Sequence, residues 1–257
     1  MYCYIECSKL QKMKKFSIIT CTKNSSLTIL DTINSVKDQN YENFEHIFVD
    51  GGSNDETVNL CNESLNSKVY IEPNLNLYEA LNYGIKKSNG EIIFILHSDD
   101  QIIDNNLLKN ISNLFEHHQI SYTYSHIIMK KNKKIYRRWN TNIIGKNEID
   151  NFKFPAHTSF FYKKEVFENI GFYDLNFKIS SDFDHLSRLF NSGLKGFFYD
   201  KAIVSMNYGG ISTKSLKNIL IQNFENYLIF KNNKINFIKI LIIFIKKFIN
   251  RYKQLKL

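Results

Sequence analysis

Four polar residues with metal-binding or hydrogen-bonding side chains stand directly behind an apolar strand pattern that ends at Leu96. They are His97, Ser98, Asp99 and Asp100. Two neighbouring carboxylates repel each other, so a fold that keeps both must compensate their charge. A divalent cation held between carboxylates and a diphosphate would do so, since hard cations take oxygen ligands. The alternative is that the two aspartates only cap the helix predicted just after them.

Two further polar clusters follow buried strand patterns earlier in the chain. They are residues 22–24 (Thr-Lys-Asn) and residues 50–53 (Asp-Gly-Gly-Ser). The strands alternate with helices, which predicts a parallel sheet covered on both faces. Ligands bind such sheets beyond the carboxyl ends of the strands. We therefore expect all three clusters to meet at one edge of one sheet.

Hydrophobic periodicity predicts the elements that position these clusters. The first hundred residues alternate, with strands at 16–21, 45–49, 69–71 and 91–96 and helices at 25–38, 56–65 and 77–87. The later part is less regular, with helices near 105–115 and at 163–170 and 181–191, a hairpin of strands at 120–128 and 134–138, and short strands at 196–199 and 202–206. The predicted class is α/β, a Rossmann-like and mostly parallel sheet flanked by helices.

Composition and missing patterns exclude several classes of protein. The 257 residues are 43% hydrophobic with only 2 proline and 10 glycine residues, which is typical of a globular chain without long linkers. No GxGxxG or GxxxxGK(S/T) pattern is present, so neither a dinucleotide site nor a P-loop is expected. The 4 cysteines form no CxxC pair, which indicates reduced thiols in a cytoplasmic protein.

The positive charge is concentrated at the C-terminal end. The net charge is +9, but eight of the 34 basic residues and no acidic residue lie from Lys231 onward, which leaves 26 basic against 25 acidic residues. A nucleic-acid-binding domain would carry its charge on the fold itself, so no nucleic-acid partner is expected. Residues 232–253 have the pattern of a basic amphipathic helix, which could lie on an anionic membrane surface or pack on the domain. Its longest uncharged apolar run, residues 240–245, is too short to span a bilayer.

Four segments together resemble a known family. They are FSIITCTKN, HIFVDGGSNDETV, EPN followed by YEALNYGIKKSNGEIIFILHSDD, and GFYDLNFKISSDFDHLSRL. In order and spacing they are similar to inverting family 2 glycosyltransferases of the GT-A type, particularly bacterial enzymes that build capsule, colanic-acid-like polysaccharide and lipopolysaccharide. The resemblance covers residues 14–210 and implies a GT-A fold.

The resemblance implies a nucleotide-sugar site at the first two strand ends. Thr20, Cys21 and Thr22 stand where the family meets the nucleobase, and Asp50 stands at the carboxylate that recognises the base, usually uracil. Ser53, in the same cluster as Asp50, is expected in the same site. The predicted donor is therefore a nucleotide sugar, most often a UDP-sugar.

The resemblance also places Ser98-Asp99-Asp100 at the DxD-type motif. One carboxylate of that motif contacts the ribose and another holds Mn²⁺ or Mg²⁺ against the diphosphate. We expect Asp100 to be the main metal ligand, with Asp99 nearer the ribose and also available to the metal. His97 replaces the acid that many relatives carry first. His157 corresponds to a histidine near the acceptor or the diphosphate, unless it is simply a satisfied buried histidine.

Asp182 stands at the position of the family's catalytic base. Inversion at an anomeric carbon is a single in-line displacement. It needs a base for the acceptor hydroxyl and compensation of charge on the leaving diphosphate, but no covalent nucleophile. Asp182 opens the helix predicted at 181–191, and a capping role there is compatible with catalysis. Asp184 is the alternative base.

The predicted organisation has three parts: a leader at 1–13 that we expect to be dispensable, a GT-A domain at 14–212, and a basic amphipathic helical tail at 213–257. The domain divides into a nucleotide-binding half at 14–104 and an acceptor half at 105–212. The predicted activity is metal-dependent, inverting transfer of a hexosyl-type sugar to an oligosaccharide or lipid-linked glycan in surface polysaccharide biosynthesis. The enzyme would be cytoplasmic and peripheral at the inner face of the membrane.

Two alternatives belong to other functional classes. A nucleotidyltransferase would carry a glycine-rich loop after the first strand, where this chain has no glycine. A non-catalytic carbohydrate-binding or scaffold protein could use a degenerate GT-A fold, which the histidine at position 97 would suit. The sequence leaves the donor sugar, the acceptor and the linkage open.

Overall fold

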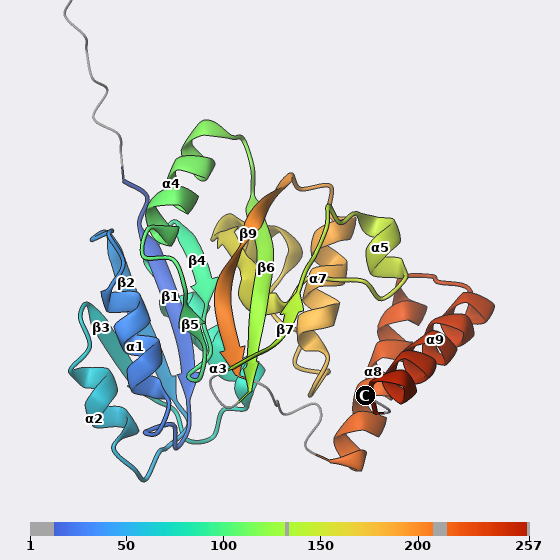
Figure 1. The fold of residues 1–257 in the computed structure, drawn as a ribbon, viewed down its shortest axis with the longest axis horizontal. Helices are drawn as coiled ribbons and strands as arrows, with labels where there is room; N and C mark the ends of the chain where they lie inside the picture. Colours follow the sequence, from blue (N-terminus) through green and yellow to red (C-terminus); the bar gives the residue numbers. More distant parts are fainter. Residues whose placement is uncertain (1–12, 132–133, 208–214, 256–257) are drawn as a thin grey trace, which may run out of the picture.

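One mixed β-sheet organises the domain in a computed structural model that describes residues 13–131, 134–207 and 215–255 (Figure 1). Within these residues the sheet has nine strands in the order β3-β2-β1-β4-β8-β6-β9-β5, with β7 paired to β6. The predicted leader at 1–13 lies, apart from Met13, outside the described residues. The sheet is mostly parallel and flanked by helices, as predicted.

The N-terminal half is the expected alternation of parallel strands and helices. Its strands are β1 (Phe16–Thr22), β2 (Phe44–Asp50), β3 (Ser67–Ile71) and β4 (Ile92–Ile95). Its helices are α1 (Ile29–Lys37), α2 (Thr57–Asn62) and α3 (Leu77–Lys87). Asn76 and Glu79 form a reciprocal capping box at the start of α3, which explains why this helix begins where the sequence predicts.

The second half extends the sheet with antiparallel and parallel pairs. Its strands are β5 (Gln101–Ile102), β6 (Tyr122–Lys131), β7 (Lys134–Trp139), β8 (Phe160–Lys163) and β9 (Gly196–Asn207). Its helices are α4 (Leu107–His117), α5 (Lys146–Asp150), the 3₁₀ turn η1 (His157–Ser159), α6 (Glu165–Ile170) and α7 (Ser181–Asn191).

The prediction of two short strands after residue 195 was wrong. They are one strand, β9, which pairs in parallel with β6 along its whole length. The register shifts where Ser125 pairs with Tyr199 and His126 with Ala202, so that Asp200 and Lys201 are left out of the ladder. A bulge of this kind lets a strand continue past two charged residues that look like a turn in the sequence.

Apolar side chains from alternate positions of the buried strands fill both faces of the sheet. One cluster packs Ile18 of β1 and Phe94 of β4 against α1 and α4. The other packs Ile19 and Ile93 against α3, α6 and α7. Because both faces are covered, these strands read as continuous apolar runs. Ligands therefore have access to this part of the sheet only at its edges and strand ends.

The C-terminal tail forms two helices, α8 (Leu216–Asn232) and α9 (Phe237–Leu255), rather than the single helix predicted at 232–253. The chain turns between them at Lys234, which has a positive φ of 58°. Ile229, Phe230, Ile240 and Ile243 join one apolar cluster with residues of α5 and α7. Helix α8 thus packs beside α7, and α9 packs on α8 (Figure 1). No helix among the described residues has both the length and the apolar character needed to cross a membrane.

Gly90 offers a direct test of the packing between β1 and the turn before β4. A Cβ atom at this position would lie 2.5 Å from the Ser17 backbone nitrogen and 2.6 Å from Ser17 Oγ. We expect Gly90→Ala to lower the free energy of unfolding by about 1–3 kcal/mol, because the backbone of β1 must shift. Gly145→Ala is the control, since its nearest neighbour would be Glu148 Oε2 at 3.4 Å. Equal effects of the two substitutions in chemical denaturation would contradict this packing.

Candidate active site

The three polar clusters meet at one edge of the sheet, as the sequence predicts. Thr22 and Asp50 are register partners at the ends of β1 and β2, and Thr22 Oγ1 donates a hydrogen bond of 2.8 Å to Asp50 Oδ1. The Asn24 amide donates to Ser53 Oγ at 2.8 Å, and the hydroxyl oxygens of Ser25 and Ser98 are 3.0 Å apart. A continuous polar network therefore joins the residues that follow β1, β2 and β4.

Asp50 is buried, and its carboxylate organises the turn that follows β2. Oδ1 accepts hydrogen bonds from Thr22 and from the Ser53 hydroxyl at 2.6 Å. Oδ2 accepts hydrogen bonds from the amides of Gly52 and Ser53 at 2.9 and 2.7 Å. Gly52 has a φ of +80°, which glycine adopts without strain, and Pro73 leaves no room for a side chain there. The role of Asp50 in recognising the base stays a prediction beside this structural one.

The side chains of Thr20 and Cys21 point to opposite faces of β1 and lie in different environments. Thr20 is fully buried, and its hydroxyl is 3.0 Å from His46 Nε2, so it supports the strand from within. Cys21 is half-buried and packs against the cluster that contains Tyr78 and Tyr173. Burial raises the pKa of the Cys21 thiol to about 12, so the thiol stays protonated and acts as an apolar contact.

The turn after β4 is held by hydrogen bonds to three other elements. Ser98 contacts Ser25, the Asp99 carbonyl accepts from Asn207 Nδ2 at 3.0 Å, and the Asp100 carbonyl accepts from Thr32 Oγ1 at 2.8 Å. These bonds use the main chain of the two aspartates. These bonds fix the backbone that carries the two carboxylates.

Asp100 is fully buried, and neither of its carboxylate oxygens has a hydrogen-bond partner among the described residues. Burial, and then the nearby Asp99, raise the pKa of Asp100 well above its usual range. An unpaired buried carboxylate is costly, and a bound cation would compensate its charge. No group of three His, Cys, Asp or Glu side chains in the described part of the chain could hold a metal ion. Further oxygen ligands would therefore have to come from a bound diphosphate and water, as is common for Mg²⁺.

His97 and His157 contact each other and connect this edge to η1. Their Nε2 atoms are 2.9 Å apart and their rings are nearly perpendicular. Burial lowers the pKa of each imidazole to about 4, so both are neutral and one donates to the other. The Nδ1 atom of His157 has no described partner. The structure thus brings His157 to the turn that carries Ser98, Asp99 and Asp100, and its role near the acceptor or the diphosphate stays a prediction.

Asp182 lies in the first turn of α7, on the face of the sheet that α3 covers. Its Oδ1 atom accepts hydrogen bonds from the Phe183 amide at 2.8 Å and from the Tyr78 hydroxyl at 3.3 Å. Burial raises the pKa of Asp182 to about 6, although these two hydrogen bonds oppose the rise. A carboxylate with this pKa is ionised at neutral pH and accepts a proton more readily than an ordinary aspartate.

Asp182 and Asp100 are not joined by a hydrogen bond within the described residues. The connection between the two regions runs through Cys21, which packs in the same cluster as Tyr78 and Tyr173. Asp182 further raises the pKa of Tyr173, as does Cys21, after the main effect of burial. The end of β1 therefore lies close to the surroundings of Asp182.

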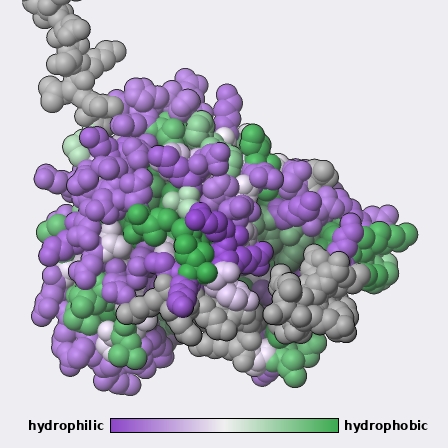
Figure 2. All heavy atoms as spheres, viewed as in Figure 1, coloured by the Kyte–Doolittle hydropathy of each residue, from purple (hydrophilic) through white to green (hydrophobic). Residues whose placement is uncertain are grey.

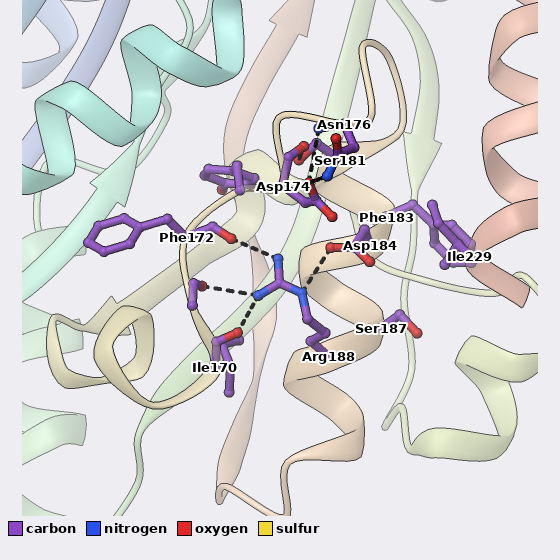
Figure 3. A network of polar contacts seen from close by, with 12 residues as sticks. Ile170, Phe172, Asp174, Asn176, Ser181, Phe183, Asp184, Ser187, Arg188 and Ile229 are labelled. Carbon is purple, nitrogen blue, oxygen red and sulfur yellow. Dashed lines mark hydrogen bonds and ion pairs between the residues drawn. The ribbon is translucent and has the colours of Figure 1, made fainter. Parts of the chain in front are cut away.

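Asp184, the alternative base, is committed to a structural network (Figure 3). Arg188 Nε donates to its Oδ2 atom at 2.8 Å. The other guanidinium nitrogens of Arg188 donate to the carbonyls of Ile170, Gly171 and Phe172, which precede α7. This arrangement holds the loop that follows α6 and leaves Asp182 as the better candidate for proton transfer.

The sequence analysis missed Glu225 of α8, which is buried and accepts hydrogen bonds from three backbone amides just before α7. It stands four residues from both Ile221 and Ile229, and so on the same side of the helix. An acid within such a stripe indicates a buried carboxylate with specific partners. Tyr78, which contacts Asp182, was also missed.

Comparison with known proteins identifies the family. The sequence model described as "Glycosyl transferase family 2" matches residues 17–175. A PGL/p-HBAD biosynthesis glycosyltransferase of Mycobacterium bovis (strain BCG / Pasteur 1173P2) is 28% identical over 208 residues, which are 77% of this chain and 78% of that protein. The minor teichoic acid biosynthesis protein GgaB of Bacillus subtilis (strain 168) is 29% identical over 181 residues, which are 65% of this chain and 20% of GgaB.

Solved structures show the same fold at low identity. S. aureus TarS 1-349 in complex with UDP-GlcNAc superposes with a TM-score of 0.67 at 18% identity, over 82% of this chain and 65% of that chain. The mannosyltransferase PcManGT of Pyrobaculum calidifontis, in complex with GDP-Man and Mn²⁺, gives 0.60 at 15% identity, over 82% and 61%. The present chain spans less than two thirds of each solved chain. The expected GT-A fold is confirmed, and with more than half of its residues matched by the family model, the chain belongs to glycosyl transferase family 2.

Proposed function

We propose that this family 2 glycosyltransferase moves a sugar from a UDP-sugar to a glycan or lipid-linked glycan, with inversion. The observation that carries the proposal is a pair of carboxylates, the buried Asp100 and the half-buried Asp182, that the fold leaves without a full set of partners. Asp100 would bind a cation, and Asp182 would accept a proton. An inverting displacement needs both of these functions.

The donor site lies at the edge formed by β1, β2 and β4. Thr22, Asp50 and Ser53 form its hydrogen-bonded wall, and Cys21 adds an apolar contact for a base. TarS, which shares the fold, has been solved with UDP and with UDP-GlcNAc, and this supports a UDP-sugar here. Thr20 is buried behind this wall and supports it through the main chain of β1.

Asp99 and Asp100 would hold Mn²⁺ or Mg²⁺, and His157 would lie near the diphosphate. The unpartnered, buried carboxylate of Asp100 fits a cation, because it lacks compensation from any described residue. When bound, the metal would withdraw negative charge from the diphosphate as it leaves. Asp99 is half-buried beside it, and so it can reach either the cation or the ribose.

Asp182 would accept the proton of the acceptor hydroxyl. The Phe183 amide and the Tyr78 hydroxyl both contact Oδ1, and Oδ2 would take the proton. No covalent intermediate is needed, since the acceptor oxygen attacks the anomeric carbon while the diphosphate leaves. Asp182 thereby determines the pH at which the enzyme is active.

Helices α8 and α9 would place the enzyme at the inner face of the cytoplasmic membrane, where it would build a cell-surface glycan. Relatives named for PGL/p-HBAD and teichoic acid biosynthesis support this setting. Apolar side chains that are exposed lie on α8 (Leu216, Leu220 and Phe224) and on α9 (Phe237, Ile238, Leu241, Ile242 and Ile245). Figure 2 shows apolar surface at the tip of the molecule where the two helices meet. Together with the eight basic residues from position 231 onward, this surface suits an anionic lipid layer.

The assignment of the base predicts different effects of two substitutions. Asp182→Asn is expected to lower kcat by about 10²- to 10⁴-fold, with UDP binding preserved, because the amide cannot take a proton. Asp184→Asn, the control, should retain most of kcat, since Asp184 serves the loop before α7. In the wild type, kcat should fall as the pH drops below about 6, because Asp182 becomes protonated. Turnover can be measured by release of UDP from a panel of UDP-sugars with Mn²⁺.

Normal turnover by Asp182→Asn would rule out this base. If the wild type turned over no nucleotide sugar in the panel and did not bind UDP, a scaffold on this fold would be the better description.

Because Asp100 is buried and has no described partner, we expect its replacement by asparagine not to destabilise the protein. In EDTA, Asp100→Asn should unfold at the same temperature as the wild type or a higher one, because the substitution removes a buried carboxylate that has no described partner. Asp50→Asn is the contrast: it replaces a carboxylate that accepts four hydrogen bonds, and it should lower the free energy of unfolding by about 1–3 kcal/mol. Thermal unfolding by circular dichroism would show both effects. A clear loss of stability in Asp100→Asn would mean that a partner satisfies Asp100.

The membrane proposal predicts that exposed isoleucines on α9 are needed for lipid binding. The double variant Ile238→Asp/Ile242→Asp should no longer float with liposomes that contain phosphatidylglycerol, because it places charge on the apolar face. Ile143→Asp is the matched control, since Ile143 is 80% exposed and lies outside the tail. Equal flotation of the wild type and the double variant would show that these isoleucines of α9 are not needed for lipid binding.

A further inference from the structure

We propose that Glu225 of helix α8 is a positioning residue that fixes the segment carrying Asp182 for catalysis. The inference rests on the proposed function, in which Asp182 is the base. It assigns to the C-terminal helices a part in the active site that none of the sequence motifs indicates, since Glu225 lies beyond the segments that resemble the family and beyond residue 175, where the family match ends.

Glu225 binds three consecutive backbone amides. Its Oε1 atom accepts from the Lys178 amide at 2.7 Å, and Oε2 accepts from the amides of Ile179 and Ser180 at 3.0 and 2.8 Å. The side chain is buried, with 5% of the residue exposed. Hydrogen bonds to an ionised acceptor are stronger than neutral ones, so a buried carboxylate with three donors holds this strip of main chain tightly. The strip leads directly into α7.

The same strip is held from the opposite side by α3. The Tyr78 hydroxyl donates to the Ile179 carbonyl at 2.7 Å, and it also lies 3.3 Å from Asp182 Oδ1. Ile179 is therefore fixed through its amide by Glu225 and through its carbonyl by Tyr78. The contact that orients the Asp182 carboxylate uses the same phenol as this clamp, so a shift of the strip would move both.

Helix α8 also holds the residue that follows Asp182. The Phe183 ring packs against Phe230 of α8 at a centroid distance of 5.4 Å, and both belong to the apolar cluster shared with α9. The Asp184 amide donates to the Ser180 carbonyl at 3.0 Å, and this hydrogen bond belongs to the first turn of α7. Asp182 thus stands between two points that α8 anchors, one polar and one apolar.

Glu225 affects the pKa of Asp182 as well as its position. The groups that face Asp182 are Tyr78 of α3, Tyr162 of β8, Tyr173 before α7, and Glu225 of α8. Burial raises the pKa of all three tyrosines, so they stay neutral near pH 7, and Glu225 is the acidic residue among the four. Burial is the main reason for the raised pKa of Asp182, and Glu225 adds to it. Removal of the Glu225 charge should therefore lower the pKa of Asp182.

The test compares Glu225→Gln with Ile243→Ala in the full chain. Glutamine has nearly the same volume but only one acceptor oxygen, so it cannot satisfy all three amides. We expect kcat to fall about 10- to 100-fold, because small displacements of a catalytic group have effects of this size. The KM for the UDP-sugar should stay within about threefold, and the acidic limb of the kcat profile should move to lower pH.

Ile243→Ala is the control for general destabilisation of the tail. Ile243 is buried in the cluster that anchors α9, with no hydrogen bond to residues 178–180. This variant should lose thermal stability and keep the pH profile of the wild type, and any loss of kcat should be smaller than in Glu225→Gln, because the Glu225 carboxylate and its three hydrogen bonds remain. If Glu225→Gln fails to fold, Glu225→Asp keeps the charge on a shorter side chain and should show a reduced kcat with an unshifted acidic limb.

Hydrogen exchange separates this inference from the proposed function. The amides of residues 178–180 should be protected in the wild type and exchange at least tenfold faster in Glu225→Gln, whether or not a donor sugar has been identified. Absence of turnover in the wild type would overturn the proposed function, while this exchange result would still establish the clamp. A folded Glu225→Gln or Glu225→Asp variant with wild-type kcat, or a kcat loss that Ile243→Ala shares, would overturn the positioning role.

Discussion

The burial of carboxylates is the constraint on which the rest of this structure depends, because a buried charge must be hydrogen-bonded, paired or neutralised. Asp50 accepts four hydrogen bonds, Glu225 accepts three, and Asp184 forms an ion pair. Asp100 has no partner in the described part of the chain, and Asp182 uses one oxygen for both of its hydrogen bonds. The satisfied carboxylates hold the main chain in place, and the other two remain available for a cation and a proton.

The need to provide partners for the buried carboxylates explains why elements far apart in the sequence pack together. The parallel order β3-β2-β1-β4 brings the ends of β1, β2 and β4 to one edge, where Asp50 ties two of them together. Helix α7 brings Asp182 to the face that α3 covers, and α8 supports the start of α7 through Glu225. The C-terminal helices are consequently part of the domain that positions the candidate base, even if their outer faces also contact lipid.

Much of the fold and part of the site could be predicted from the sequence. The helices at 77–87 and 181–191 have the predicted bounds, because local periodicity determines both and a capping box starts the first. The meeting of the three clusters followed from parallel topology alone. The prediction of two strands at the position of β9 was wrong, because residue types alone do not distinguish a bulge from a turn. Glu225 lies about 45 positions from the amides that it binds, and no local pattern specifies such a pairing.

Asp100, which is buried and has no described partner, would complete a metal and diphosphate site. Calorimetric titration of UDP into the wild type and into Asp100→Asn, each with and without Mn²⁺, is the sharpest test of this role. The wild type should bind UDP much more tightly with Mn²⁺ than without it, and Asp100→Asn should lose this difference. Equal affinity for UDP with and without Mn²⁺ in the wild type, or an undiminished effect of Mn²⁺ in Asp100→Asn, would contradict it.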